Sequence, residues 1–243
     1  MSSVILDSRH VHSSINGDMS VRAKVDTATM EWQRSPISKV WRKRIHLVGS
    51  AEAGQVTSLV RYEPGAEFPT HGHPNGEEIL VLTGVFGDEH GEWPVGTHLL
   101  HPEGFSHAPF SSVGCELLVK LQQYSGLGRE RRVTHTEEME WQITAHEGIR
   151  TKILCADWNF SDETQLEEWD PGTSPGTWSY RDGAEILVLR GSFEDENGLY
   201  EQHSWLRIPA GGSHAPFSRI GCRLYVKTSG VSNLKTVEPK AND

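Results

Sequence analysis

The chain has few cysteines and no long apolar run, and each of these features excludes a class of protein. Three cysteines in 243 residues, with no Cys-x-x-Cys pair, argue against a disulfide framework and favour a reducing cytoplasm. No stretch approaches the roughly 20 apolar residues of a membrane span. Residues 1–14 lack the apolar core of a signal peptide. We therefore expect a cytoplasmic protein with no membrane partner.

Positive charge is also scarce. The formal net charge is −10, whereas a nucleic-acid surface needs clustered Lys and Arg, so we expect no nucleic-acid partner. The basic run at 42–44 is short, and the sequence alone favours its interpretation as a solvated face or linker.

The helical spacing of apolar residues is missing as well. In its place the chain has short apolar or alternating segments separated by turns, with 24 Gly, 12 Pro and 8 Trp. The clearest segments are 56–62, 79–82, 97–100 and 116–121. Short strands with turn residues at regular spacing are typical of a sandwich or barrel, so we predict an all-β fold.

An internal repeat divides the chain. The sequence EILVL begins at Glu78 and again at Glu185, and the same shift of 107 residues relates SHAPFS at 106–111 to SHAPFS at 213–218. MEW occurs at 30–32 and 139–141, so the two copies differ there by two residues. We predict two homologous domains. The expected parts are an N-terminal arm (1–26), a first domain (27–125), a linker (125–132), a second domain (134–230) and a tail (231–243).

Four side chains of the first copy form a candidate metal site. His71 and His73 are two residues apart and share a face of an extended chain, and Glu77 has the same parity. His107 follows about 30 residues later. Imidazole nitrogen and carboxylate oxygen suit Zn, Fe, Mn, Ni or Cu. The alternative is that these are ordinary surface or hydrogen-bonded histidines, which we expect for the isolated pair His10 and His12.

The wider spacing resembles the two cupin signatures. Every position of the first signature, G-x5-H-x-H-x3-E-x6-G, is filled by Gly65, His71, His73, Glu77 and Gly84. The second signature, G-x5-P-x-G-x2-H-x3-N, is met from Gly96 to His107, and only its last position departs, with Ser111 in place of Asn. The resemblance covers both repeats and implies a bicupin, in which two jelly-roll (double-stranded β-helix) barrels share one chain.

The second copy lacks the metal-binding residues. Trp178, Tyr180 and Ala184 stand where the first copy has its two paired histidines and its glutamate, and only His214 is kept. We therefore predict that the second domain is degenerate and metal-free. Its aromatic side chains either fill the space or line a pocket for an organic ligand, with Trp158, Trp169 or Trp205 as candidate walls.

The phrases GEEILVLTG and PEGFSHAPFSSVGCELLVKL are similar to the ChrR-like cupin family, related to the cupin domain of the anti-sigma factor ChrR. The resemblance implies zinc held by His71, His73, Glu77 and His107, a regulatory role in stress sensing and transcription, and a sigma factor as partner. ChrR proteins bind that partner through a helical N-terminal domain with a zinc motif, which this sequence does not contain.

An enzyme is the alternative. Related cupins include iron-dependent dioxygenases of diketones and similar carbonyl compounds, whose metal keeps a position open for substrate. Apart from Glu77, the sequence identifies no catalytic residue. One divalent metal per chain is expected in either case, with zinc first and Fe, Mn or Ni next. A monomer and a homodimer both remain open.

Overall fold

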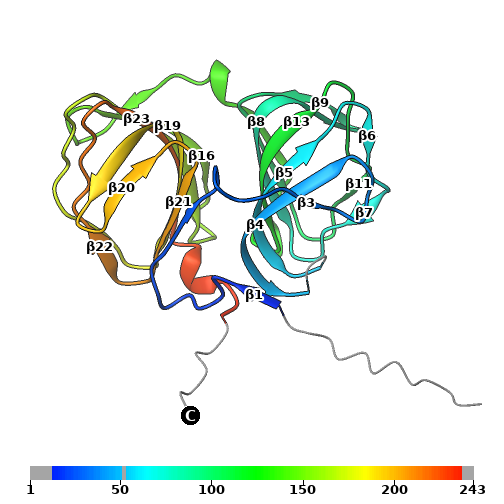
Figure 1. Ribbon diagram of the computed structural model, residues 1–243, viewed down its shortest axis with the longest axis horizontal. Coiled ribbons are helices and arrows are strands. Elements are labelled where there is room, and N and C mark those ends of the chain that lie inside the picture. The colour runs from blue at the N-terminus through cyan, green and yellow to red at the C-terminus, as the bar shows by residue number, and fades with distance from the viewer. Residues whose placement is uncertain (1–12, 51–52, 237–243) are drawn as a thin grey trace, which may run out of the picture.

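The computed structural model describes residues 13–50 and 53–236, and these form two β-barrels side by side (Figure 1). The strands of the first barrel are β1 (Ser13–Ile15), β3 (Gln33–Arg34), β4 (Val40–Gly49), β5 (Gln55–Tyr62), β6 (Ala66–Glu67), β7 (His71–Gly72), β8 (Glu77–Asp88), β9 (Gly91–Pro94), β10 (Thr97–His101), β11 (Ser106–His107), β12 (Phe110–Ser111), β13 (Cys115–Leu121) and β14 (Arg132–His135). Those of the second are β2 (Ala23–Asp26), β15 (Gln142–Ile143), β16 (Ile149–Ala156), β17 (Glu163–Trp169), β18 (Trp178–Tyr180), β19 (Ala184–Asp195), β20 (Gly198–Glu201), β21 (Ser204–Ile208), β22 (Gly212–His214) and β23 (Cys222–Thr228).

Within residues 13–50 and 53–236, helix is confined to two short turns of 3-10 helix, η1 (Thr136–Glu138) and η2 (Val231–Asn233). Across the described ranges, nothing helical has the length and apolar character that a bilayer span requires. The predicted all-β bicupin fold is confirmed, and the four segments expected to be strands lie in β5, β8, β10 and β13.

Each barrel has one large sheet, and from β4 and β16 onward the two sheets follow the same path. The first runs β1-β4-β5-β13-β8-β10-β14, and the second runs β15-β16-β17-β23-β19-β21-β2. The strand pairings of both sheets are antiparallel. Along each extended strand, side chains alternate between the barrel interior and the opposite face. In β8, Ile79 and Val81 enter the core of the first barrel, whereas Leu80 packs in a third cluster.

That third cluster is the interface between the barrels. It contains Leu59, Leu80 and Leu118 from the first barrel with Leu166 and Leu187 from the second, all nearly inaccessible to solvent. The apolar runs of the sequence are continuous because one set of alternate residues fills a barrel and the other fills the interface. Each copy therefore covers an apolar flank of the other.

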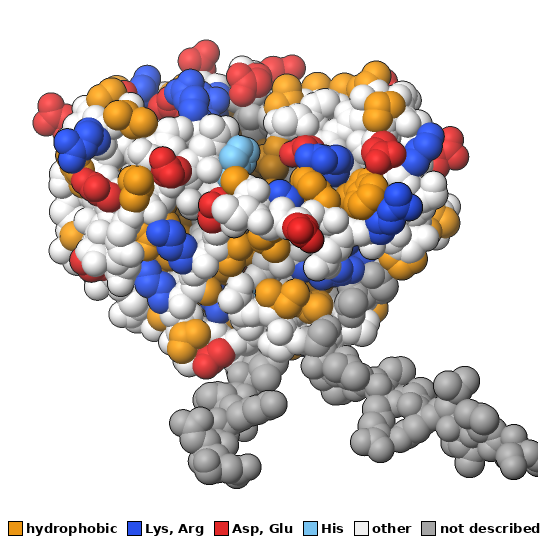
Figure 2. All heavy atoms as spheres, in the orientation of Figure 1, with side chains coloured by type: hydrophobic (Ala, Val, Ile, Leu, Met, Phe, Trp, Pro, Cys, Tyr) orange, Lys and Arg blue, Asp and Glu red, His pale blue; other side chains and the backbone are white. Residues whose placement is uncertain are grey.

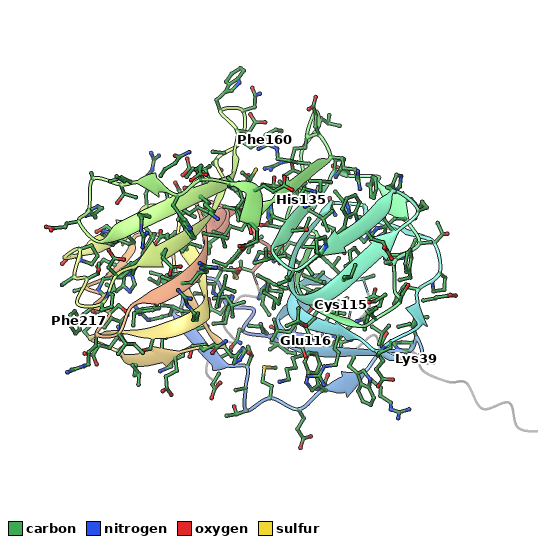
Figure 3. The ribbon with its side chains drawn as sticks, turned by 90° about the horizontal axis from the view of Figure 1, so that it is seen from above. Lys39, Cys115, Glu116, His135, Phe160 and Phe217 are labelled. Atoms are coloured by element: carbon green, nitrogen blue, oxygen red, sulfur yellow. The ribbon has the colours of Figure 1, made fainter. Side chains whose placement is uncertain are left out.

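The two barrels also exchange strands. Strand β2 pairs with β21 of the second barrel, and β14 pairs with β10 of the first. Figure 3 shows His135, the last residue of β14, on the side of the first barrel. Strands β2 and β14 occupy equivalent places ahead of the two MEW sequences. The arm expected at residues 1–26 is thus part of the fold over its described residues 13–26.

The basic run at 42–44 is not the solvated face that the sequence favoured. Lys43 is buried, donates a hydrogen bond to the Thr27 carbonyl at 2.7 Å and lies over the Trp32 ring at 4.7 Å. Lys152 of the second copy repeats this with the Thr136 carbonyl and Trp141. The repeated MEW sequence therefore supplies the aromatic partner of a buried lysine. The prediction failed because a charge run does not reveal which residue faces the neighbouring barrel.

Charge on the outer surface is mixed. Figure 2 shows acidic and basic side chains interspersed over the visible face of both barrels. The three cysteines are free and buried, and burial raises the pKa of the Cys115 thiol to about 11. Such thiols are poor nucleophiles at neutral pH, which favours a structural role for them.

Candidate metal centre

The candidate site lies at one end of the first barrel, where short strands place three histidines together. Strands β7 and β11 pair so that His71 lies directly opposite His107. The backbone N–H of His73 bonds the Phe105 carbonyl at 2.9 Å, which fixes the second histidine of the pair beside them. Ring nitrogens of these three residues lie within 4.8 Å of one another.

A tight turn aims the glutamate at the same point. Gly76 has φ +72°, and a Cβ there would lie 2.4 Å from the Tyr124 carbonyl oxygen, so only glycine fits. The next residue, Glu77, begins β8 and is buried. Its Oε2 atom lies 3.4 Å from Nε2 of His73 and 3.6 Å from Nε2 of His107.

The four residues expected from the sequence are therefore brought together. The two ring nitrogens of His73 and His107 are 3.1 Å apart, and both point toward the glutamate. Two imidazole nitrogens and a carboxylate oxygen this close together form a donor set that one divalent cation can share. His71 is the most exposed of the four and lies at the mouth of the site.

The electrostatics give His73 and Glu77 the forms that bind metal. Burial lowers the pKa of His73 to about 4, despite the opposing effect of Glu77, so its imidazole is neutral at pH 7. Burial raises the pKa of Glu77, but its interactions with His73, with the hydrogen-bonding His101 and with His107 outweigh this effect and bring the pKa to about 2. An ionised carboxylate and a neutral imidazole are the ligand forms of these side chains.

Asp88 orients one of the proposed ligands, His107. Nδ1 of His107 donates to Oδ2 of Asp88 at 3.2 Å, which leaves Nε2 of that ring facing the site. Burial raises the pKa of Asp88, but this hydrogen bond and the one from the His90 backbone outweigh it and lower the value. A carboxylate behind a histidine is the usual outer partner of a metal ligand.

The sequence analysis missed His101. It ends β10, lies opposite Glu77 in the sheet, and donates from Nδ1 to Oε2 of that residue at 3.0 Å. Its ring stacks on Phe105 at 4.3 Å, and its buried Nε2 has no hydrogen-bond partner among the described residues. With Glu77 and His107 it forms a second possible group of metal ligands. Only the register of β8 and β10 reveals it, and one sequence does not give that register.

Among the residues that the structure describes, the second barrel has no comparable set at the equivalent place. Trp178 lies opposite His214 in the second barrel, just as His71 lies opposite His107 in the first. Nε2 of His214 is 3.3 Å from the Tyr180 hydroxyl, and its Nδ1 donates to Asp195 at 3.0 Å. Trp178, Tyr180 and Trp169 surround a space with a cavity volume of about 0 Å³. The aromatic side chains therefore fill the space inside the second barrel and do not line a pocket for an organic ligand.

Two of the tryptophans considered as pocket walls lie elsewhere. Trp158 is 94% exposed, and Trp205 belongs to the interface cluster between the barrels. Of the three candidates, Trp169 alone borders this space.

The adjacent glutamates Glu77 and Glu78 provide a direct test of register. Glu77→Gln should weaken metal binding by more than about 100-fold, since even the loss of an outer partner costs about 10–100-fold. Glu78 faces the second barrel, where it accepts from Lys227 at 2.8 Å, so Glu78→Gln should leave metal affinity within about threefold of the parent. Competition with a chromophoric chelator on folded protein measures both. The opposite ranking would show that Glu78 is the ligand.

Comparison with known proteins agrees with this architecture. The family model described as the ChrR cupin-like domain matches residues 20–125 and again 129–232. A search of curated proteins finds no match. A structure described as a "putative dioxygenase" from Nostoc punctiforme is 16% identical, covers 92% of this chain and 88% of its own, and superposes with a TM-score of 0.71.

Two other solved structures are similar. YlbA from Escherichia coli is 15% identical over 96% of this chain and 98% of its own, with a TM-score of 0.67. A deletion mutant of oxalate decarboxylase OxdC from Bacillus subtilis is 12% identical over 85% of this chain and 76% of its own, with a TM-score of 0.60. Identities this low establish the shared fold alone.

Proposed function

The chain belongs to the ChrR cupin-like family, and from this premise we propose that its first barrel binds one divalent metal ion and presents it to a small-molecule substrate. His71, His73, Glu77 and His107 are the proposed ligands, and the second barrel is the proposed metal-free partner. The reaction class that we propose is that of the cupin dioxygenases, with a small carbonyl compound as substrate.

One observation carries the proposal, namely that the site has an open side. A cavity of about 440 Å³ borders His71 and His73, and its other walls include Ile37, Phe68 and Leu121. Apolar walls with a few polar groups at one end are typical of sites for small organic molecules. A structural zinc site is closed by four protein ligands and needs no such space.

The residues of the chain have distinct parts in this proposal. His101 holds Glu77 in place, and Asp88 holds His107, so both ligands keep their orientation as a substrate enters. The apolar walls exclude water from the bound substrate. A divalent ion held there would supply Lewis-acid chemistry and, as Fe(II), the capacity to react with oxygen.

A zinc-bound regulator is the second candidate. The family match supports it, and so does the close approach of His73, Glu77 and His107, whose ligand atoms lie 3.1–3.6 Å from one another. In that case the four proposed ligands would close the coordination shell, and the role would lie in sensing stress. A sigma factor as partner rests on the family resemblance alone.

Cobalt substitution separates the two candidates. With Co(II) in the untagged protein we expect the weak visible absorption of a five- or six-coordinate ion, because the open side leaves room for water or substrate. A four-ligand tetrahedral site absorbs much more strongly. Intense tetrahedral bands would contradict the enzyme proposal and favour the zinc-bound regulator.

A further inference from the structure

A second cavity lies between the two barrels, apart from the candidate metal centre. Its volume is about 310 Å³, roughly twice that of an apolar protein cavity that holds benzene. It shares no wall residue with the 440 Å³ cavity beside His71 and His73. Glu116, one of its wall residues, lies on the side of the first barrel that faces the second (Figure 3). The proposed function therefore gives this space no role.

The inner walls of the cavity are apolar and come from both copies of the repeat. They include three pairs of leucines related by the shift of 107 residues, namely Leu59 and Leu166, Leu80 and Leu187, and Leu82 and Leu189. The first two pairs are buried in the interface cluster, and the third pair is partly buried against it. Equivalent strands of the two barrels thus enclose the space together, and neither barrel forms it alone.

The charged side chains that border the cavity balance one another. Two are acidic and two are basic, namely Glu116, Glu137, Arg190 and Arg223. Both arginines donate to the carboxylate of Glu168, and Glu116 accepts a hydrogen bond from Arg61 at 2.9 Å. The cavity therefore offers a ligand no net counter-charge. Because a charged ligand would lose its hydration against the leucines, the walls favour a neutral one.

One buried wall residue has an unused hydrogen-bonding group. Thr136 is 1% exposed, and its Oγ1 atom has no hydrogen-bond partner among the described residues. A Cβ added to Gly96, which also lines the cavity, would lie 2.9 Å from this oxygen. Thr27, the counterpart of Thr136 in the first copy, donates its hydroxyl to the His203 carbonyl at 2.8 Å. A buried hydroxyl without a partner is destabilising, and an acceptor atom on a ligand would satisfy it.

We propose that this cavity binds a neutral, mostly apolar small molecule, such as an aryl ketone, whose carbonyl oxygen accepts a hydrogen bond from the Thr136 hydroxyl. The leucine pairs bury the body of the molecule, as in other sites for small organic ligands. The exposed residues Thr83, Val95 and Gln202 border the cavity and form its entrance. Because both barrels supply the walls, the bound molecule stabilises their association. The site goes beyond the proposed function and does not depend on it, since none of the proposed metal ligands borders it.

Benzophenone tests the proposal, because it is a neutral aryl ketone that forms covalent bonds with nearby C–H groups under ultraviolet light. The full-length protein is irradiated with it, with and without metal, and peptide mass spectrometry locates the bonds. We expect labelling of β8 and β19 around Leu82 and Leu189 in both cases. Thr136→Val keeps the shape of the side chain and should lower this labelling by about 2–10-fold at subsaturating benzophenone, the effect of one neutral hydrogen bond. Thr27→Val, whose hydroxyl does not border the cavity, is the control and should be labelled like the parent.

A charged probe tests the chemical class of the ligand. 4-Benzoylbenzoate carries a carboxylate on the same ketone and should label β8 and β19 at least about tenfold less than benzophenone does. Equal labelling by the two probes, labelling confined to the metal-centre cavity around Phe68 and Leu121, or undiminished labelling of folded Thr136→Val would each overturn the proposal. Circular dichroism establishes that each variant is folded before irradiation. If Thr136→Val does not fold, the position of the label and the comparison of the two probes on the parent still decide.

Discussion

Replacing His73 with Ala is expected to reduce metal affinity by more than about 100-fold and to remove the stabilisation that the metal provides. His73 is buried, and its Nε2 lies within 3.4 Å of both His107 and Glu77, so its loss opens the centre of the proposed ligand set. A metal present at 100 times its dissociation constant stabilises the native state by about 2.7 kcal/mol. Thermal unfolding of the parent with and without metal should show that difference, and the variant should not.

His214→Ala is the matched control for this experiment. His214 occupies in the second barrel the strand position of the ligand His107, and Asp195 lies behind its ring as Asp88 lies behind that of His107, but Trp178 and Tyr180 are its neighbours. Metal content and the metal-dependent change in unfolding temperature should both match the parent. Undiminished metal binding in His73→Ala, or its loss in His214→Ala, would place the site elsewhere.

Replacing Lys227 with Met is expected to destabilise the protein by about 3–5 kcal/mol, the cost of removing one partner from a buried ion pair. Nζ of Lys227 crosses the interface to Oε2 of Glu78 at 2.8 Å and also contacts Asp162 at 3.2 Å. Glu78 is 1% exposed and Lys227 is 3% exposed. Without the ammonium group, two buried carboxylates lose a counter-charge. Urea unfolding followed by tryptophan fluorescence measures the change.

Two controls isolate the buried pair. Arg150 and Asp170 also lie 2.8 Å apart, but both are about half exposed, so Arg150→Met should cost less than about 1 kcal/mol. Adding Glu78→Gln to Lys227→Met should recover part of the lost stability, since the uncompensated charge is removed. Equal effects of the buried and exposed replacements would show that the interface pair contributes no more than a surface contact.

The repeat explains why both copies keep this glutamate. Glu185, the counterpart of Glu78, pairs with Lys120, the counterpart of Lys227, so two equivalent ion pairs cross the interface in opposite directions. Burial raises the pKa of Glu78, but Lys227 and the hydrogen bond from His98 outweigh it and hold it well below its ordinary value. A carboxyl with a depressed pKa contributes stability above its unfolded value of about 4.3, and that contribution is lost as the pH falls below it.

The sequence was sufficient for those features that are local or repeated. The all-β class follows from short alternating segments, and the two barrels follow from the shift of 107 residues between the copies. His71, His73 and Glu77 share a face because side chains alternate along an extended chain. The turn at Gly76, between His73 and Glu77, keeps Glu77 on the same face as the two histidines.

The missed features depend on contacts between distant strands. His101 meets Glu77 only through the register of β8 against β10. Strands β2 and β14 each join the other copy's barrel, a choice that no local pattern encodes. Lys43 resembles its two neighbours in the sequence, but alternation directs it into the interface and Arg42 into the cavity wall.

The central claim is that the first barrel holds one metal ion and the second holds none. Elemental analysis of untagged protein, purified without added metal or chelator, tests it most directly. We expect one divalent ion per chain in the parent and in His214→Ala, and less than one tenth of that in His73→Ala. Two ions per chain, or one that persists in His73→Ala, would contradict the account, as would a parent protein that binds no divalent metal even when it is supplied.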